Sequence, residues 1–262
     1  MPVVTHDFPI LEYDAAQRGI IMPNRYGGAA LPSICIITFF GDVLTDFVAQ
    51  SGAQVVHCYR SEMGHFPVYS FAYGGVSLCA VQGVVGSASI AMMTDFLIGC
   101  GVKAIIACGG CGALDHIPAG DVILPLSALR DEGASYHYLP PARDIELDAD
   151  MISVLRDTLA EHRVPWLECK TWTTDGFYRE TPDMITHRKA EGCRVVEMEC
   201  ASIAAVARFR GAAFGQLLYS GDLLADLSCY DERDWMGNRT VRDALFSLSL
   251  AAATRIRLAI TF

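Results

Sequence analysis

Three acidic residues stand where apolar segments end, and carboxyl groups in such places can take part in catalysis. Glu197 and Glu199 lie at a predicted strand-to-helix junction, and Asp222 follows the apolar stretch 215–221. A buried acid needs a partner. Either glutamate could cap the helix through its dipole or accept hydrogen bonds from both hydroxyls of a vicinal diol. Asp222 could cap the next segment or act as an acid in a cleft.

A run of small residues, Gly109-Gly110-Cys111-Gly112, follows the buried apolar segment 103–108. We expect a turn there, whose backbone N–H groups could converge on an anion. A tight packing turn without a ligand is the alternative. Cys108 and Cys111 match the C-x-x-C pattern of redox proteins, but no second pair or nearby histidines accompany them, so we expect a packing role.

The elements that position these residues alternate between strand and helix. We expect strands over 33–40, 54–59, 76–82, 103–108, 121–124, 166–171 and 213–219, and helices from Gly41 onward and over 87–100, 148–162, 199–210 and 239–258. The strands are apolar throughout, which indicates an α/β fold with a largely parallel or mixed sheet. Ligands of such sheets bind at the carboxyl ends of the strands, where the glycine-rich and acidic segments fall.

Composition narrows the class of protein. The 262 residues are 52% hydrophobic and 19% charged with a net charge of −10, which excludes a disordered chain and disfavours nucleic-acid binding. Ten cysteines lie mostly in apolar runs, and the N-terminal residues lack a basic and then apolar signal pattern, so we expect a reducing, cytoplasmic setting. The uncharged stretch 68–94 is interrupted by glycines, and we expect no membrane span. No linker divides the chain, which favours one domain over residues 1–262.

These segments together resemble the nucleoside phosphorylase family, which includes bacterial-type purine nucleoside phosphorylases, uridine phosphorylases and nucleosidases. Val196-Glu-Met-Glu-Cys-Ala is similar to the family's ribose-binding motif, and Gly109-Gly-Cys-Gly-Ala-Leu with Gly120-Asp-Val-Ile-Leu-Pro is similar to its phosphate-side loop and following strand. Segments 130–138 and 173–178 also look like family segments. The resemblance implies a three-layer α/β/α domain around a mixed, partly barrel-like sheet.

The resemblance also implies roles for single residues. Ribose would bind Glu199 through its 2′- and 3′-hydroxyls, with Met198 beneath the sugar, Glu197 beside it and His6 reaching in from a neighbouring subunit. Phe177 and Gly221 would contact the base, and Asp222 would protonate a purine ring nitrogen. Phosphate, the co-substrate, would bind Gly41, Gly109 and Gly110, and Arg60 would contact it across the same subunit interface. No metal or organic cofactor is implied, and a homodimer or homohexamer with shared active sites is expected.

Two positions depart from the family pattern. Thr45 and Ala107 stand where the family has phosphate-binding arginines, and losing bidentate guanidinium groups weakens capture of an anion. The leading hypothesis is phosphorolysis of a nucleoside, with a purine favoured through Asp222. The alternatives are a nucleosidase that uses water, a uridine phosphorylase, and a nucleoside-binding homologue without activity.

Overall fold

The computed structural model describes residues 3–24 and 30–259. Within these residues the strands are β1 (Ile34–Thr38), β2 (Gln54–Ser61), β3 (Gly64–Tyr73), β4 (Val76–Gln82), β5 (Ala104–Ala113), β6 (Val122–Asp131), β7 (Asp144–Glu146), β8 (Trp166–Thr174), β9 (Cys193–Glu197) and β10 (Ala213–Leu223). The α-helices are α1 (Gly41–Ser51), α2 (Ser87–Gly99), α3 (Ala149–Glu161), α4 (Pro182–Ala190), α5 (Cys200–Arg210) and α6 (Arg239–Ala259).

All ten strands belong to one mixed sheet that partly closes on itself. Strand β10 pairs with both β5 and β6, and β6, β8, β9 and β5 follow in order, so these five strands form a ring. From β5 the sheet continues outward through β1, β4, β3 and β2. Strand β9 pairs with β5 at Gly112 and Ala113. The ring is therefore closed beside the glycine-rich part of β5.

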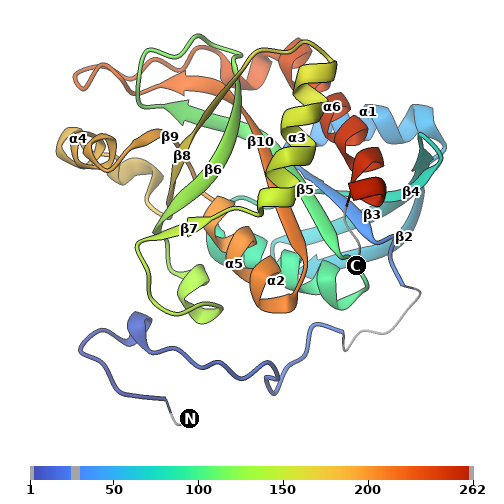
Figure 1. The fold of residues 1–262 in the computed structure, drawn as a ribbon, viewed down its shortest axis with the longest axis horizontal. Coiled ribbons are helices and arrows are strands. Elements are labelled where there is room, and N and C mark those ends of the chain that lie inside the picture. Colours follow the sequence, from blue (N-terminus) through green and yellow to red (C-terminus); the bar gives the residue numbers. More distant parts are fainter. Residues whose placement is uncertain (1–2, 25–29, 260–262) are drawn as a thin grey trace.

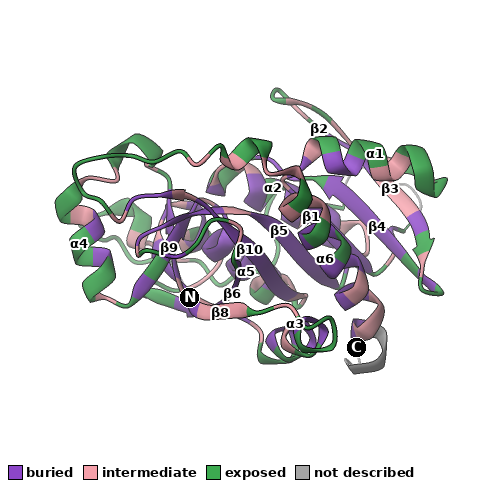
Figure 2. Ribbon diagram, turned by 90° about the horizontal axis from the view of Figure 1, so that it is seen from above, coloured by how far each residue is buried: buried purple, intermediate pink, exposed green. Residues whose placement is uncertain are grey.

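Helices cover both faces of this sheet. Helices α2 and α5 pack together on one face, and α3 and α1 pack against α6 on the other (Figure 1). The strands between them, including β1, β4 and β5, are almost wholly buried (Figure 2). A parallel strand covered on both faces must be apolar throughout, which is why the sequence shows uninterrupted apolar runs. The expected α/β fold with a partly closed mixed sheet is confirmed.

One part of the expected arrangement is wrong. The glycine-rich segment is not a turn, because β5 continues through it to Ala113, and Gly109 and Gly110 pair with Leu218 and Tyr219 of β10. None of these glycines has a positive φ. Small residues are needed here for packing: a Cβ on Gly112 would lie 2.6 Å from Leu224 Cδ1. The backbone N–H groups of Gly109 and Gly110 therefore belong to a strand and do not form an anion-binding loop.

The elements also differ in extent from the expected ones. The sequence did not predict strands β3 and β7 or helix α4, and β6 and β8 run on to Asp131 and Thr174. Strand β9 is the strand of the predicted junction at Glu197. The uncharged stretch 68–94 forms the end of β3, strand β4 and the start of α2, with Gly74 and Gly75 at positive φ in the hairpin turn. Among the described residues, no helix is long and apolar enough to cross a membrane.

Candidate active site

A cavity of about 460 Å³ opens beside the strand ring, and most of its lining residues come from five parts of the chain. Its walls come from the end of β1, the glycines of β5, the segment after β8, the β9–α5 junction and strand β10. The lining residues are Phe39, Val85, Gly109, Gly110, Cys111, Gly112, Phe177, Glu180, Val196, Glu197, Met198, Glu199, Gln216, Leu218, Asp222 and Trp235. Most of the residues predicted for ribose and base therefore share one cavity.

The carboxylate of Glu197 stabilises the start of α5. Its Oε2 accepts hydrogen bonds from the backbone N–H of Glu199 at 2.7 Å and of Cys200 at 2.6 Å. Its Oε1 accepts from the hydroxyl of Thr173 at 2.6 Å. Burial raises the pKa of Glu197 to about 7 even though these donors favour the charged form. Since both oxygens have protein donors, Glu197 acts as the helix-capping carboxylate and orders the residue that follows.

Glu199 is the N-cap residue of α5 and lies almost wholly inside the protein. One oxygen, Oε1, accepts from the backbone N–H of Gly86 at 2.6 Å. Gly86 has φ +95°, a conformation that suits glycine, so the chain before α2 can turn its N–H toward the carboxylate. Burial, and then the charge of Glu197, raise the pKa of Glu199 to about 8. Burial thus favours the protonated form of both glutamates more than water would.

The cavity carries a second pair of acids. Asp222 near the end of β10 has a raised pKa because of burial, although its backbone, Tyr230 and Arg233 act in the other direction. Burial and the nearby charge of Asp222 raise the pKa of Glu180 to about 8. A carboxyl group that keeps its proton near neutral pH can serve as a general acid. The sequence did not identify Glu180 as a site residue. The one feature that could have indicated it is its position three residues after Phe177.

The remaining ribose and base candidates divide into two groups. Phe177, in a short 3-10 turn (Phe177–Arg179), and Met198 both line the cavity. Gly221 does not line it: a Cβ there would lie 3.1 Å from Trp235 Cβ and 3.4 Å from the Cys111 carbonyl oxygen. Gly221 thus permits close packing behind Asp222.

Three residues predicted for phosphate or ribose do not line the cavity of their own chain. Gly41 begins α1 and faces the side chain of Gln82. His6 is exposed on the N-terminal segment, where its Nδ1 accepts from the backbone N–H of Phe8. Arg60 is exposed on β2 beside a separate cavity of about 230 Å³. Service of His6 and Arg60 to a neighbouring subunit stays a prediction.

The side chains at the two positions that lack the family's arginines carry no positive charge to pair with phosphate. The hydroxyl of Thr45 donates to the carbonyl of Gly41 at 2.7 Å, within α1. Ala107 is fully buried in β5 between Ile37 of β1 and Gln216 of β10. The guanidinium groups that those positions would supply are therefore absent.

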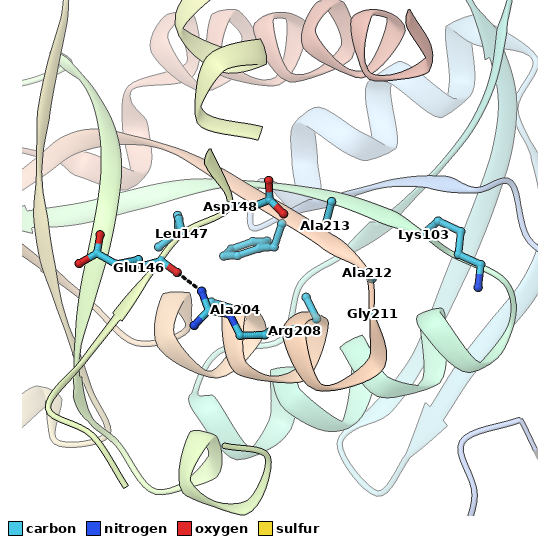
Figure 3. A pocket seen from close by; sticks show the side chains of 11 residues that line it. Lys103, Glu146, Leu147, Asp148, Ala204, Arg208, Gly211, Ala212 and Ala213 are labelled. Carbon is cyan, nitrogen blue, oxygen red and sulfur yellow. Dashed lines mark hydrogen bonds between the residues drawn. The ribbon is translucent and has the colours of Figure 1, made fainter. Parts of the chain in front are cut away.

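Another cavity, of about 420 Å³, lies at the opposite ends of β5 and β10, between α5 and the start of α3 (Figure 3). Its charged groups are engaged or point apart. Arg208 donates to the carbonyl of Glu146, and Asp148 accepts from two backbone N–H groups as the N-cap of α3. Lys103 points away from both (Figure 3). No set of converging groups comparable to the acids of the first cavity is present among these lining residues.

Known proteins place this arrangement in a family. A family model described as the phosphorylase superfamily matches residues 33–258. The chain belongs to the phosphorylase superfamily. The resemblance found in the sequence is thereby confirmed. The purine nucleoside and uridine phosphorylases of this superfamily are pentosyltransferases.

Single members of the phosphorylase superfamily are distant from this chain. A guanosine phosphorylase of Halorubrum lacusprofundi is 26% identical over 166 residues, which cover 61% of this chain and 67% of that protein. A DeoD-type purine nucleoside phosphorylase of Bacillus cereus is 27% identical over 216 residues, covering 78% and 89%. A uridine phosphorylase structure from Vibrio fischeri superposes with a TM-score of 0.74 at 19% identity, covering 90% of this chain and 95% of that one. At that identity the structure supports the fold alone.

Proposed function

We propose that the protein cleaves the N-glycosidic bond of a purine nucleoside with phosphate, giving the free base and ribose 1-phosphate. The observation that carries this proposal is the placement of Glu199 and Asp222 in one cavity. A buried carboxylate suited to a diol and a carboxyl group suited to proton donation then flank a space of nucleoside size. The names of the two sequence relatives support a purine nucleoside.

The reaction places opposite demands on the two ends of the cavity. As the bond between C1′ and the base nitrogen breaks, positive charge develops on the ribose and the electron pair goes to the base. A phosphate oxygen forms the new bond to C1′, and the proton of Asp222 goes to a ring nitrogen of the leaving purine. Groups that meet charge developing in the transition state accelerate the reaction. The raised pKa of Asp222 favours the protonated form that this step needs.

The base would lie among Phe177, Glu180 and Asp222. Phe177 offers a ring face for stacking, and the two acids offer hydrogen-bonding groups at the edge of the base. A protonated carboxyl group can donate to a purine ring nitrogen, whereas a pyrimidine nucleoside lacks the imidazole nitrogen of a purine. This arrangement favours purine over uracil.

Hydrolysis is the second candidate, and one observation favours it. The described residues that line the cavity include four acids and no lysine, arginine or histidine. A phosphate dianion in such a cavity needs a cation from elsewhere, which is the role predicted for Arg60 of a second subunit. Water carries no charge and has no such need.

The test is a panel of purine and pyrimidine ribonucleosides incubated with and without phosphate, with the free base and the sugar product measured. Phosphorolysis predicts base release that depends on phosphate and yields ribose 1-phosphate from purine nucleosides. Equal rates without phosphate, with free ribose as product, would establish the hydrolase. Preferential cleavage of uridine would overturn the purine assignment.

A further inference from the structure

A buried amide in the cavity wall has no use in the roles described so far. Gln216 of β10 is 1% exposed and lines the cavity. Its Oε1 has no hydrogen-bond partner among the described residues. A buried acceptor without a donor destabilises a protein, and native proteins keep few of them. Such an atom at the wall of a binding cavity is explained if a ligand supplies the donor.

The position of Gln216 indicates which part of the substrates it meets. It pairs in register with Ala107 of β5, and Leu218, two residues on, pairs with Gly109. Residues paired in register on neighbouring strands point to the same face, so the amide occupies the side on which Ala107 offers only a methyl group. Asp222 lies six residues further along β10, up to about 20 Å away in an extended strand. Gln216 therefore stands at the end remote from the proposed base acid, next to the glycines predicted for phosphate.

The chemistry of an amide differs from that of the arginine found elsewhere in the family. A guanidinium group only donates hydrogen bonds and treats all tetrahedral dianions alike, whereas the amide oxygen only accepts. Hydrogenphosphate carries one O–H group that can donate to such an oxygen. Sulfate has the same shape and charge but no proton to give.

We infer that Gln216 is a positioning residue that accepts a hydrogen bond from the P–O–H group of hydrogenphosphate and makes the site select phosphate over sulfate. This inference rests on the proposed phosphorolysis. The bond holds the phosphate at the Ala107 end of the cavity, with its unprotonated oxygens free to face C1′. No covalent step passes through Gln216.

The experiment compares the wild-type protein with Gln216→Met, which keeps the length of the side chain and removes its polar atoms. Gln50→Met, at an exposed position near the end of α1, is the matched control. Dissociation constants for sodium phosphate and sodium sulfate are measured by titration calorimetry at a mildly alkaline pH, where both anions carry two charges. Michaelis constants for phosphate and for the nucleoside, and the thermal midpoint, are measured on the same samples.

The wild type should bind phosphate more tightly than sulfate by roughly tenfold to a hundredfold, the range for one hydrogen bond to a charged group. In Gln216→Met, phosphate binding should weaken until the two anions bind alike, while the Michaelis constant for the nucleoside changes by less than about threefold. The thermal midpoint should rise by a few degrees, because an unpaired buried acceptor has been removed. Gln50→Met should behave as the wild type.

An unchanged ratio of phosphate to sulfate affinity in Gln216→Met would overturn the inference, and so would a wild type that binds both anions equally. These binding measurements do not require turnover. A failure of phosphorolysis itself would instead be seen as base release that ignores phosphate, whatever the anion preference of the protein.

Discussion

Replacing Glu199 with alanine removes a carboxylate that the proposed function assigns to the ribose hydroxyls. In the structure this carboxylate lies inside the cavity with Oε1 held by the backbone N–H of Gly86 at 2.6 Å. The anchored carboxylate is thus already oriented before a nucleoside binds. Preorganised groups contribute their full interaction to the transition state because they need no rearrangement.

The expected magnitude follows from the number of hydroxyls that bind. Each hydrogen bond to a charged acceptor contributes about 1.5–3 kcal/mol. A ribonucleoside that donates two such bonds should lose about 3–6 kcal/mol in Glu199→Ala, a decrease in kcat/KM of roughly 10²- to 10⁴-fold. A 2′-deoxyribonucleoside donates one bond and should lose about half as much energy. The preference of the enzyme for ribose over deoxyribose should therefore fall by about one hydrogen bond, or roughly 10- to 100-fold.

The assay is the initial rate of base release from matched pairs of ribo- and 2′-deoxyribonucleosides at saturating phosphate. Glu199→Gln separates the charge from the anchor, because the amide oxygen can still accept from Gly86. Asp157→Asn, an exposed carboxylate on α3, controls for a change in net charge. If Glu199→Ala lowers both members of each pair by the same factor, the carboxylate does not bind the 2′-hydroxyl and the reasoning is refuted.

Three further predictions concern the other charged groups. Asp222→Asn, which cannot supply a proton, should lower kcat by about 10²- to 10⁴-fold with a small change in the nucleoside KM; single-turnover rates near wild type would contradict the acid role. The nucleoside KM should fall as pH rises through about 8, because the raised pKa of Glu199 means that its ionised, hydroxyl-accepting form is populated only at higher pH, and Glu199→Gln should lose this dependence. Arg60→Ala should raise the KM for phosphate far more than that for nucleoside if a neighbouring subunit uses Arg60, and an active monomer in light scattering would rule that use out.

The sequence by itself determined the fold class and the main acids of the site. Apolar runs without alternation reveal strands buried on both faces, since each residue of such a strand contacts a helix layer. The stretch around Glu197 and Glu199 is recognisable because two acids inside an apolar region must have specific partners. Both the apolar runs and the acids within them can be recognised from neighbouring residues in the sequence.

Only the tertiary structure showed which groups each of the two glutamates contacts. Glu197 and Glu199 differ by two residues, yet Glu197 accepts from the start of α5 whereas Glu199 accepts from Gly86, more than a hundred residues away in sequence. The same holds for Glu180, which becomes a neighbour of Asp222 only when the segment after β8 folds over the end of β10. Contacts of this kind depend on strand order in the ring.

The glycine-rich segment shows most clearly what the sequence alone could not predict. From sequence, four small residues after an apolar run look like a turn, because glycine is the residue that turns favour. The strand continues instead, because β10 pairs with β5 along Gly109 and Gly110. The next glycine, Gly112, has no room for a larger side chain beside Val196 and Leu224. The same holds for Gln216: that its Oε1 has no hydrogen-bond partner among the described residues depends on the strands around it and cannot be predicted from the sequence.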